Sequence, residues 1–382
     1  MENRRSEQVR AVLDAHWMPE GYAAPNSQAY PWQWLWDSCF HSIIWVELGE
    51  PKRAVVELAS ALSTQDAGGF IPHMNYVRDP GFHASFWGRS GSSCITQPPM
   101  FGHAVAMLHR RGVAVPADVV RRAHRGIRFL LETRHRHRPR GLVLLAHPWE
   151  TGCDDSPRWD DLCPGEGFSP ARWRARKGEL VSTIEHDAAG APLANRAFAV
   201  ASVGFNALVA FNASELGVDA GDLRDALDAQ WVDASCTWVD AGDTEYGSGR
   251  ARTLDGLLPV LVERRAARVR LVLDAALDDR AYGGSFGPAG VHRDEPSFEA
   301  GTYWRGPAWP QLSYLLWVAA RRHGLHAHAS ELATRTVGGA FTSGLAEYWS
   351  PDTGAGLGAI PQSWTGLALV MARVEGLSAA RG

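Results

Sequence analysis

The sequence predicts an all-α protein in which six helical hairpins close into an (α/α)6 barrel, a six-hairpin toroid with long loops at one end. Two observations predict this fold. Apolar residues recur with the helical period in about a dozen segments, most of them in adjacent pairs joined by short turns, and few stretches alternate as strands do. Long loops rich in Gly, Pro and Trp separate the pairs. A helical solenoid is the alternative, although no sequence repeat of fixed period supports it.

The first expected helix covers residues 4–16 and carries Val9, Val12 and Leu13 on one face. Another begins near Pro51, because proline is tolerated in the first turn of a helix. The other expected helices follow the same period and pair up along the chain: 36–48 with 51–64, 99–112 with 116–134, 194–215 with 220–231, 253–263 with 265–277, and 306–323 with 327–347, before 362–375 ends the series.

Four long loops separate these pairs, at residues 17–35, 66–98, 135–192 and 278–305. Loops of this length inside a compact domain are usually functional. We therefore expect them to be active-site loops that form a pocket at one end of the barrel. No shift in composition marks a domain boundary, so residues 1–382 are expected to form a single domain.

Composition argues against several classes of function. The net charge of −4 and the pI of about 6.4 give no basic field that would attract nucleic acid. No apolar run of about 18 residues offers a membrane span, and no apolar signal-peptide core follows the polar N-terminus, so we expect a cytoplasmic protein. The five cysteines are scattered and form no CxxC pair, which predicts neither a disulfide framework nor a zinc site.

The chain contains 16 tryptophans, and many of them lie in a few short motifs that also contain Gly, Pro and carboxylates. Aromatic faces stack on sugar rings, and a pair of carboxylates is the usual equipment for cleaving a glycosidic bond. These motifs indicate a carbohydrate-active enzyme.

The first motif contains Trp32, Trp34 and Trp36, followed by Asp37. In an extended segment the alternation places the three indoles on one side, where they would form a platform for a sugar. Asp37 would then accept hydrogen bonds from sugar hydroxyls. The alternative is that the indoles belong to the core and that Asp37 only caps the next helix.

Two further loop residues, Tyr76 and Gln97, are candidates for orienting a ligand, although a structural role is the stronger alternative for each of them. His73 is expected to be a hydrogen-bonded structural histidine, because no second histidine lies at metal-ligand spacing from it.

Asp154 is the candidate general acid. Trp149 precedes it by five positions, and a carboxyl group beside apolar rings has a raised pKa, as an acid at neutral pH requires. The alternative is a simple turn, which the sequence Asp-Asp-Ser-Pro also favours. Asp155, Asp160 and Asp161 compete for the role.

Glu347 is the second candidate carboxylate, with Asp352 as its local competitor. It is expected at the end of a long helix, where the macrodipole disfavours a negative charge, which hints at function. The rigid segment 301–310 opens a helix and projects aromatic side chains suited to a pocket wall. The aromatic candidates in and beyond this segment are Tyr303, Trp304, Trp309 and Trp364.

Taken together, the strings YPWQWLWDSCFH, GFIPHM, TQPP, HPWETGCDDSPRWD, GTYWRGPAWP and EYWSPDTGAGLGAIPQSWT resemble glycoside hydrolase family 63. The chain is most similar to its short bacterial members, which hydrolyse glucosylglycerate or mannosylglycerate. The motifs run in the family's order from about residue 20 to the C-terminus. The resemblance implies one (α/α)6 barrel and inversion at the anomeric carbon.

The resemblance also implies roles for individual residues. Asp154 matches the general acid and Glu347 matches the general base. In the family pattern asparagine follows the acid, whereas this chain has Asp155. Sugar-binding positions correspond to Tyr30, Trp34, Trp36, Asp37, Trp149, Tyr303, Trp304 and Trp309, and glycerate-binding positions to Tyr30, Tyr76 and Gln97.

We therefore expect an inverting, exo-acting hydrolase of a small α-glucoside or α-mannoside. Glucosylglycerate and mannosylglycerate are the favoured substrates. The enzyme would need no metal or organic cofactor and would bind a small-molecule glycoside. The sequence leaves open both a monomer and a homo-oligomer. Another small α-glucosidase or a trehalase-like enzyme is the nearest alternative. A sugar epimerase would require paired histidines, which the sequence lacks, and a catalytically inactive sugar-binding protein is disfavoured by the presence of both carboxylates.

Overall fold

The computed structural model describes residues 2–163, 165, 167–242 and 251–377. Its helices are α1 (Glu2–His16), α2 (Leu35–Glu47), α3 (Pro51–Ser63), α4 (Ala84–Trp87), α5 (Phe101–Arg110), α6 (Ala117–Arg128), α7 (Pro170–Val181), α8 (Val203–Glu215), α9 (Gly221–Asp228), α10 (Ala266–Leu277), α11 (Pro310–Arg322), α12 (His326–Thr342) and α13 (Leu367–Val374). Shorter turns of 3-10 helix include η2 (Pro148–Thr151), η3 (Pro157–Leu162), η4 (Asp233–Ser235), η5 (Leu254–Leu261) and η6 (Ser363–Gly366), and α6 continues into a π-helical turn, η1 (Phe129–Thr133).

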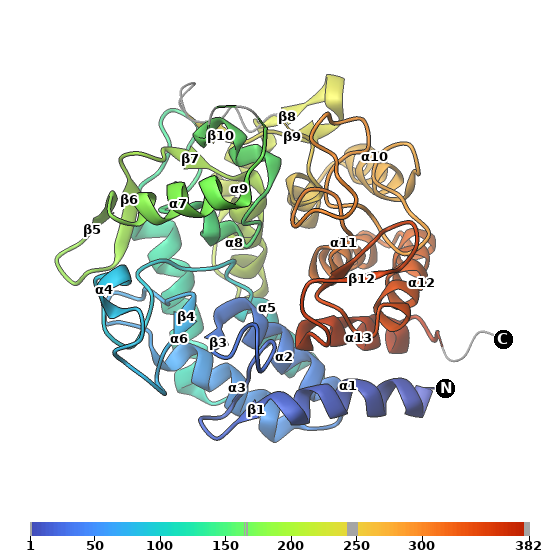
Figure 1. The fold of residues 1–382 in the computed structure, drawn as a ribbon, viewed down its shortest axis with the longest axis horizontal. Coiled ribbons are helices and arrows are strands. Elements are labelled where there is room, and N and C mark those ends of the chain that lie inside the picture. Colours follow the sequence, from blue (N-terminus) through green and yellow to red (C-terminus); the bar gives the residue numbers. More distant parts are fainter. Residues whose placement is uncertain (1, 164, 166, 243–250, 378–382) are drawn as a thin grey trace.

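The helices form a closed ring of six pairs (Figure 1). The inner members α2, α5, α8, η5, α11 and α13 each contact the next, and α13 contacts α2 to close the ring. The outer members α3, α6, α9, α10 and α12 each pack on the inner helix that precedes them. The sixth pair joins the two ends of the chain, because α1 packs on α13. The predicted six-hairpin toroid is confirmed.

Burial explains which helices lie inside. Every residue from Leu35 to Trp45 in α2 is buried, and the same holds for the first eleven residues of α8 and of α11. A helix that is buried all round must lie in a core. The outer helix α3 instead buries one stripe that includes Leu58 and Leu62.

The strands are short and all form two-stranded antiparallel pairs. The pairs are β1 (Trp17–Met18) with β2 (Tyr22–Ala23), β3 (Gln33–Trp34) with β4 (Met74–Asn75), β5 (Ile184–His186) with β6 (Pro192–Asn195), β7 (Val200–Ala201) with β10 (Ala241–Gly242), β8 (Trp231–Val232) with β9 (Thr237–Trp238), and β11 (Tyr348–Trp349) with β12 (Gly356–Leu357).

Three predicted helices differ from the structure for identifiable reasons. Helix α8 begins at Val203 rather than at residue 194, because Ser202 caps it by accepting a hydrogen bond from a backbone N–H and the preceding residues pair as strands. The segment predicted as helix 253–263 is 3-10, since Pro259 inside it lacks an N–H. Helix α12 ends at Thr342, not at residue 347.

The predicted loop 135–192 contains a helix that the sequence reading missed, α7. Ser169 caps it and Pro170 occupies its first turn, which is a favourable start for a helix. This helix lies outside the six pairs of the ring, and its Lys177 is hydrogen-bonded to His147 and to the backbone of Asp154 in the segment that follows α6.

The tryptophan motif is also not fully extended as predicted. Trp34 belongs to β3, whereas Trp36 lies in the first turn of α2. Asp37 lies in the same turn and does not cap the helix, because the N-cap position is Trp34. A carboxylate in the first turn is nonetheless favoured by the helix dipole.

Candidate active site

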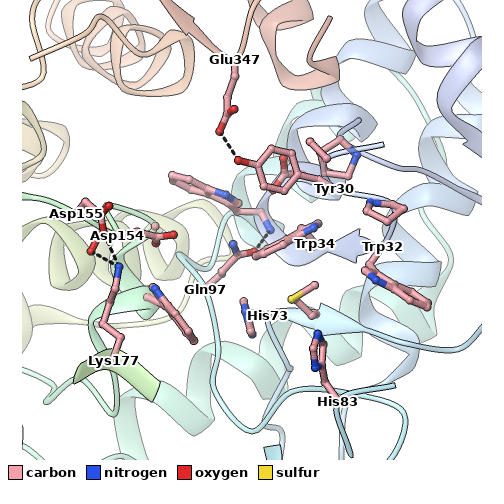
Figure 2. Close-up of a pocket in the computed structure, with 18 of the residues that line it drawn as sticks. Tyr30, Trp32, Trp34, His73, His83, Gln97, Asp154, Asp155, Lys177 and Glu347 are labelled. Carbon is pink, nitrogen blue, oxygen red and sulfur yellow. Dashed lines mark hydrogen bonds and ion pairs between the residues drawn. The ribbon is translucent and has the colours of Figure 1, made fainter. Parts of the chain in front are cut away.

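The long connections of the ring lead from an outer helix to the next inner helix, and the turns from inner to outer helices are short. The long segments therefore gather at one end, where the inner helices begin. There they enclose a cavity of about 760 Å³. Figure 2 shows part of its lining, with side chains contributed by segments from both ends of the sequence.

Asp154 lines this cavity from the loop after η2. Gly152 turns the chain with a φ of +69°, and a Cβ there would lie 2.6 Å from the indole of Trp36. Glycine therefore fits this position because both the backbone conformation and the close approach exclude a side chain. The result is that Trp36 lies directly against the loop that carries Asp154.

A buried ion pair holds the same loop from behind. Glu150 accepts hydrogen bonds from both terminal nitrogens of Arg134, at 2.9 and 2.8 Å, and neither side chain is exposed. Glu150 Oε1 also accepts from the backbone N–H of Thr96 at 3.1 Å. Because Gln97 follows Thr96, this carboxylate fixes the loop that carries Asp154 and the Gln97 segment relative to each other.

Burial raises the pKa of Asp154 to about 7. Lys177 lowers this pKa, whereas Asp155 and Glu347 raise it, and the hydroxyl of Tyr303 lowers it. Asp154 therefore keeps its proton close to neutral pH, as a general acid must.

Lys177 compensates the charge of Asp155, the residue that replaces the family's asparagine. Its ammonium forms an ion pair with Asp155 and donates to the backbone oxygen of Asp154 at 3.1 Å. The same ammonium lies over the rings of Trp149 and Trp173, 5.6 and 5.9 Å from their centroids. The second negative charge beside Asp154 is therefore neutralised within the wall of the cavity.

Glu347 lines the cavity from the residue just before β11. Its Oε1 accepts from the hydroxyl of Tyr30 at 3.0 Å, and its Oε2 accepts from the backbone N–H of Ala359 at 2.9 Å. Burial raises the pKa of Glu347, and these two donors oppose that rise. Since both hydrogen bonds favour the charged form, the surroundings suit a general base.

The helix-end argument for Glu347 is wrong, because α12 ends five residues earlier. Gly344 and Leu345 adopt φ of +73° and +60° and turn the chain back after the helix. Gly358 approaches the carboxylate closely: a Cβ there would lie 2.5 Å from Glu347 Oε2. The turn and this glycine, rather than a helix end, place Glu347.

Asp154 and Glu347 approach the cavity from separate sides (Figure 2). Burial raises the pKa of both groups, but only Glu347 accepts hydrogen bonds from Tyr30 and from the backbone of Ala359, which oppose the rise in its pKa. Two carboxyl groups whose environments separate their protonation states are the arrangement for acid and base catalysis.

The competing carboxylates have other partners. Asp160 pairs with Arg305 at 2.7 Å, and Asp352 pairs with Arg293 at 2.6 Å. Asp161 is exposed. None of these three aspartates lines the cavity.

Most of the predicted aromatic residues line the cavity: Tyr30, Trp34, Trp36, Trp149, Tyr303, Trp304 and Trp364. Trp309 is a correction, because it lies behind Trp304 and does not reach the cavity. The two indoles stack with centroids 3.6 Å apart and an interplanar angle of 4°. Trp304 adopts a φ of 59°, which is uncommon for a residue with a side chain. Trp309 thus supports the ring of Trp304, which lines the cavity.

Asp37, Tyr76 and Gln97 line the cavity as well. Burial raises the pKa of Asp37 well above its usual range. The Tyr76 hydroxyl accepts from Trp87 Nε1 at 3.0 Å, and Gln97 Oε1 accepts from the backbone N–H of Trp36 at 3.2 Å. Because Gln97 Oε1 is engaged, its amide nitrogen is the group that Gln97 offers to a ligand.

His73 is a structural histidine, as expected. Its Nδ1 lies 2.5 Å from the hydroxyl of Ser93, and burial lowers its pKa to about 3. Across the residues that the structure describes, no group of three or more His, Cys, Asp or Glu side chains is arranged to hold a metal ion.

Two elements of the cavity wall were missed at the sequence level, because both lay inside predicted loops. The short helix α4 and its approach contribute Phe82, His83, Phe86 and Trp87, and helix α7 contributes Pro170, Arg174, Lys177 and Gly178. The Ser169-Pro170 helix start was a signal that could have located α7.

The pH dependence of kcat/KM tests the electrostatics around Asp154. Activity is expected to fall above a pH of about 7 as Asp154 loses its proton. Lys177→Met should move this alkaline limb of the pH profile to higher pH, because it removes the cation that lowers the pKa of Asp154. The exposed Lys52, the only other lysine, offers the matched control Lys52→Met.

A double change, Lys177→Met with Asp155→Asn, removes the two opposed charges together and should return the limb toward its wild-type position. If Lys177→Met folds and leaves the limb where it was, Lys177 does not tune the acid.

Two such carboxyl groups in an aromatic-lined cavity are suited to cleaving a glycosidic bond. The comparisons with known proteins agree, and the chain is a glycoside hydrolase. Residues 30–365 match the family model of the mannosylglycerate hydrolase MGH1-like glycoside hydrolase domain, and the chain belongs to that family. No helix in the described residues is long and apolar enough to cross a membrane.

Relatives with assigned activities are similar over almost the whole chain. The mannosylglycerate hydrolase of Thermus thermophilus is 28% identical over 90% of this chain and 94% of its own length. The glucosylglycerate hydrolase of Mycolicibacterium hassiacum is 29% identical over 89% of this chain and 91% of its own length. A crystal structure of a family 63 mannosylglycerate hydrolase from Thermus thermophilus, in complex with Tris, superposes with a TM-score of 0.81 and 25% identity, covering 96% of this chain and 99% of that one.

Proposed function

We propose that this chain, acting as a single (α/α)6-barrel domain, hydrolyses a 2-O-α-glycosyl derivative of glycerate, either glucosylglycerate or mannosylglycerate. Two relatives of nearly equal similarity carry these two activities by name. The observation that carries the proposal is the pair of carboxyl groups in one aromatic-lined cavity, Asp154 with a pKa raised to about 7 and Glu347 with two hydrogen-bond donors.

In the proposed mechanism Asp154 protonates the glycosidic oxygen while Glu347 deprotonates a water on the opposite face of the sugar. The anomeric carbon is inverted because the water attacks from the side away from the leaving group. An inverting pair needs about 6.5–9.5 Å between its carboxyl groups to admit that water. The hydroxyl of Tyr30 keeps Glu347 charged and oriented.

The sugar would lie between the aromatic walls formed by Trp34, Trp36 and Trp304, with Asp37 accepting hydrogen bonds from its hydroxyls. Tyr76 and the amide nitrogen of Gln97 would contact the glycerate.

A panel of three substrates tests the proposal. Purified enzyme is incubated with glucosylglycerate, mannosylglycerate and trehalose, and free hexose is assayed. We expect hexose release from one or both glycerate glycosides and little from trehalose, which has no carboxylate. Preferred cleavage of trehalose would replace the proposal with a trehalase-like activity.

A further inference from the structure

We propose that Arg174 is a specificity-determining residue that pairs with the carboxylate on the leaving group of the substrate. The inference rests on the proposed function and names the residue that recognises the charged end of glycerate. Arg174 belongs to α7, the helix that lies outside the six pairs of the ring.

The cavity needs a cation to accept such a substrate. Four carboxyl groups line it, namely Asp37, Asp154, Asp155 and Glu347. In a 2-O-glycosylglycerate the substrate carboxylate is attached to the carbon that bears the glycosidic oxygen. It therefore comes close to Asp154 when that residue protonates the oxygen. Asp155 is paired with Lys177, but Glu347 carries a negative charge that no cation of the described cavity wall compensates, so an anion placed there without a nearby cation would be repelled.

The residues matched to glycerate binding do not supply that charge. Tyr30, Tyr76 and Gln97 are uncharged hydrogen-bonding groups, and the hydroxyl of Tyr30 is already bonded to Glu347. They can orient glycerate, but a separate cation must balance its charge.

Four side chains in the cavity wall can carry a positive charge: His73, His83, Arg174 and Lys177. Burial lowers the pKa of His73 to about 3, so that imidazole is neutral. Lys177 is committed to its ion pair with Asp155. His83 packs its ring against Phe82, with centroids 4.1 Å apart, and an imidazole is not a permanent cation.

Arg174 is the remaining cation. It is exposed at the cavity, and no carboxylate of the described chain lies within 4.0 Å of its guanidinium nitrogens, the limit for an ion pair here. Arginine keeps its charge and binds carboxylates through two parallel hydrogen bonds.

The position of Arg174 on α7 fits this role. It precedes Lys177 by three residues, and residues three apart on a helix are neighbours on one face. The ammonium of Lys177 is 3.1 Å from the backbone oxygen of Asp154. Arg174 thus lies one helical turn from the lysine that contacts the backbone of Asp154, on the face that Pro170 and Gly178 also present to the cavity.

The test compares a charged substrate, glucosylglycerate, with its neutral counterpart, 2-O-α-glucosylglycerol. The two differ at one group, because a hydroxymethyl group replaces the carboxylate. Arg174→Gln should lower the ratio of kcat/KM for the charged over the neutral substrate by about 10- to 100-fold, the usual effect of losing a hydrogen bond to a charged group. The loss should appear mainly in KM. Arg174→Glu should lower the ratio further, and Arg174→Lys should restore part of it.

Arg176→Gln is the matched control, because Arg176 belongs to the same helix but pairs with Glu179 and does not line the cavity. It should keep the wild-type ratio. An unchanged ratio in Arg174→Gln, with a wild-type enzyme that cleaves glucosylglycerate, overturns the role of Arg174 and leaves the proposed function standing. A wild-type enzyme that cleaves neither glucosylglycerate nor mannosylglycerate overturns both.

Discussion

Asp154→Asn is expected to lower kcat on the glycerate glycosides by about 100- to 10,000-fold, the usual contribution of a general acid. The asparagine amide cannot protonate the leaving oxygen. An α-glycosyl fluoride releases fluoride without a proton, so the same variant should cleave it with a much smaller loss. Steady-state kinetics on both substrates measures the difference.

The variant should also stay folded. Burial raises the pKa of Asp154, which means that the folded protein disfavours its charged form. Above the folded pKa of about 7 this ionisation costs stability, so an uncharged amide should be no less stable there. Thermal unfolding of the variant and the wild type at a mildly alkaline pH checks this. Near-normal turnover of the natural glycoside by a folded Asp154→Asn would shift the acid role to Asp155.

Glu347→Gln is expected to cause a loss of similar size, about 100- to 10,000-fold in kcat, but with a different signature. The attacking water then has no base, whichever group leaves. The loss should therefore appear on the glycosyl fluoride as well as on the glycerate glycosides. Parallel kinetics of the two catalytic variants on the two substrates separates acid from base.

The control for Glu347→Gln is Asp352→Asn. Asp352 is the neighbouring carboxylate at the surface, paired with Arg293 and outside the cavity. It should turn over substrate almost as the wild type does. If Asp352→Asn were inactive and Glu347→Gln active, the base would be Asp352.

The ring of helices could be read from the sequence because its inner and outer members have different, strong patterns. Inner helices such as α8 are apolar all round, and outer helices such as α3 bury one stripe. Short turns between them dictate antiparallel pairing. The positions of Asp154 and Glu347 in one cavity follow from the same topology, since the long loops end where the inner helices begin.

Other features depend on contacts that periodicity does not report. The indole of Trp309 resembles its neighbours in sequence but stacks behind Trp304, and only packing decides which of the two faces the cavity. Helix α7 was concealed in a loop rich in Gly and Pro. Its ion pair between Lys177 and Asp155 joins residues 22 positions apart, so the compensation of Asp155 was not visible from the local motif.

The stereochemistry of the first product tests the central claim most directly. Purified enzyme is mixed with glucosylglycerate or mannosylglycerate in an NMR tube, and proton spectra follow the anomeric signals of the released hexose before mutarotation. Acid catalysis by Asp154 with base catalysis by Glu347 predicts that the β-hexose and glycerate appear first. Initial release of the α-hexose would show retention through a covalent intermediate, and would contradict this assignment of the two carboxyl groups.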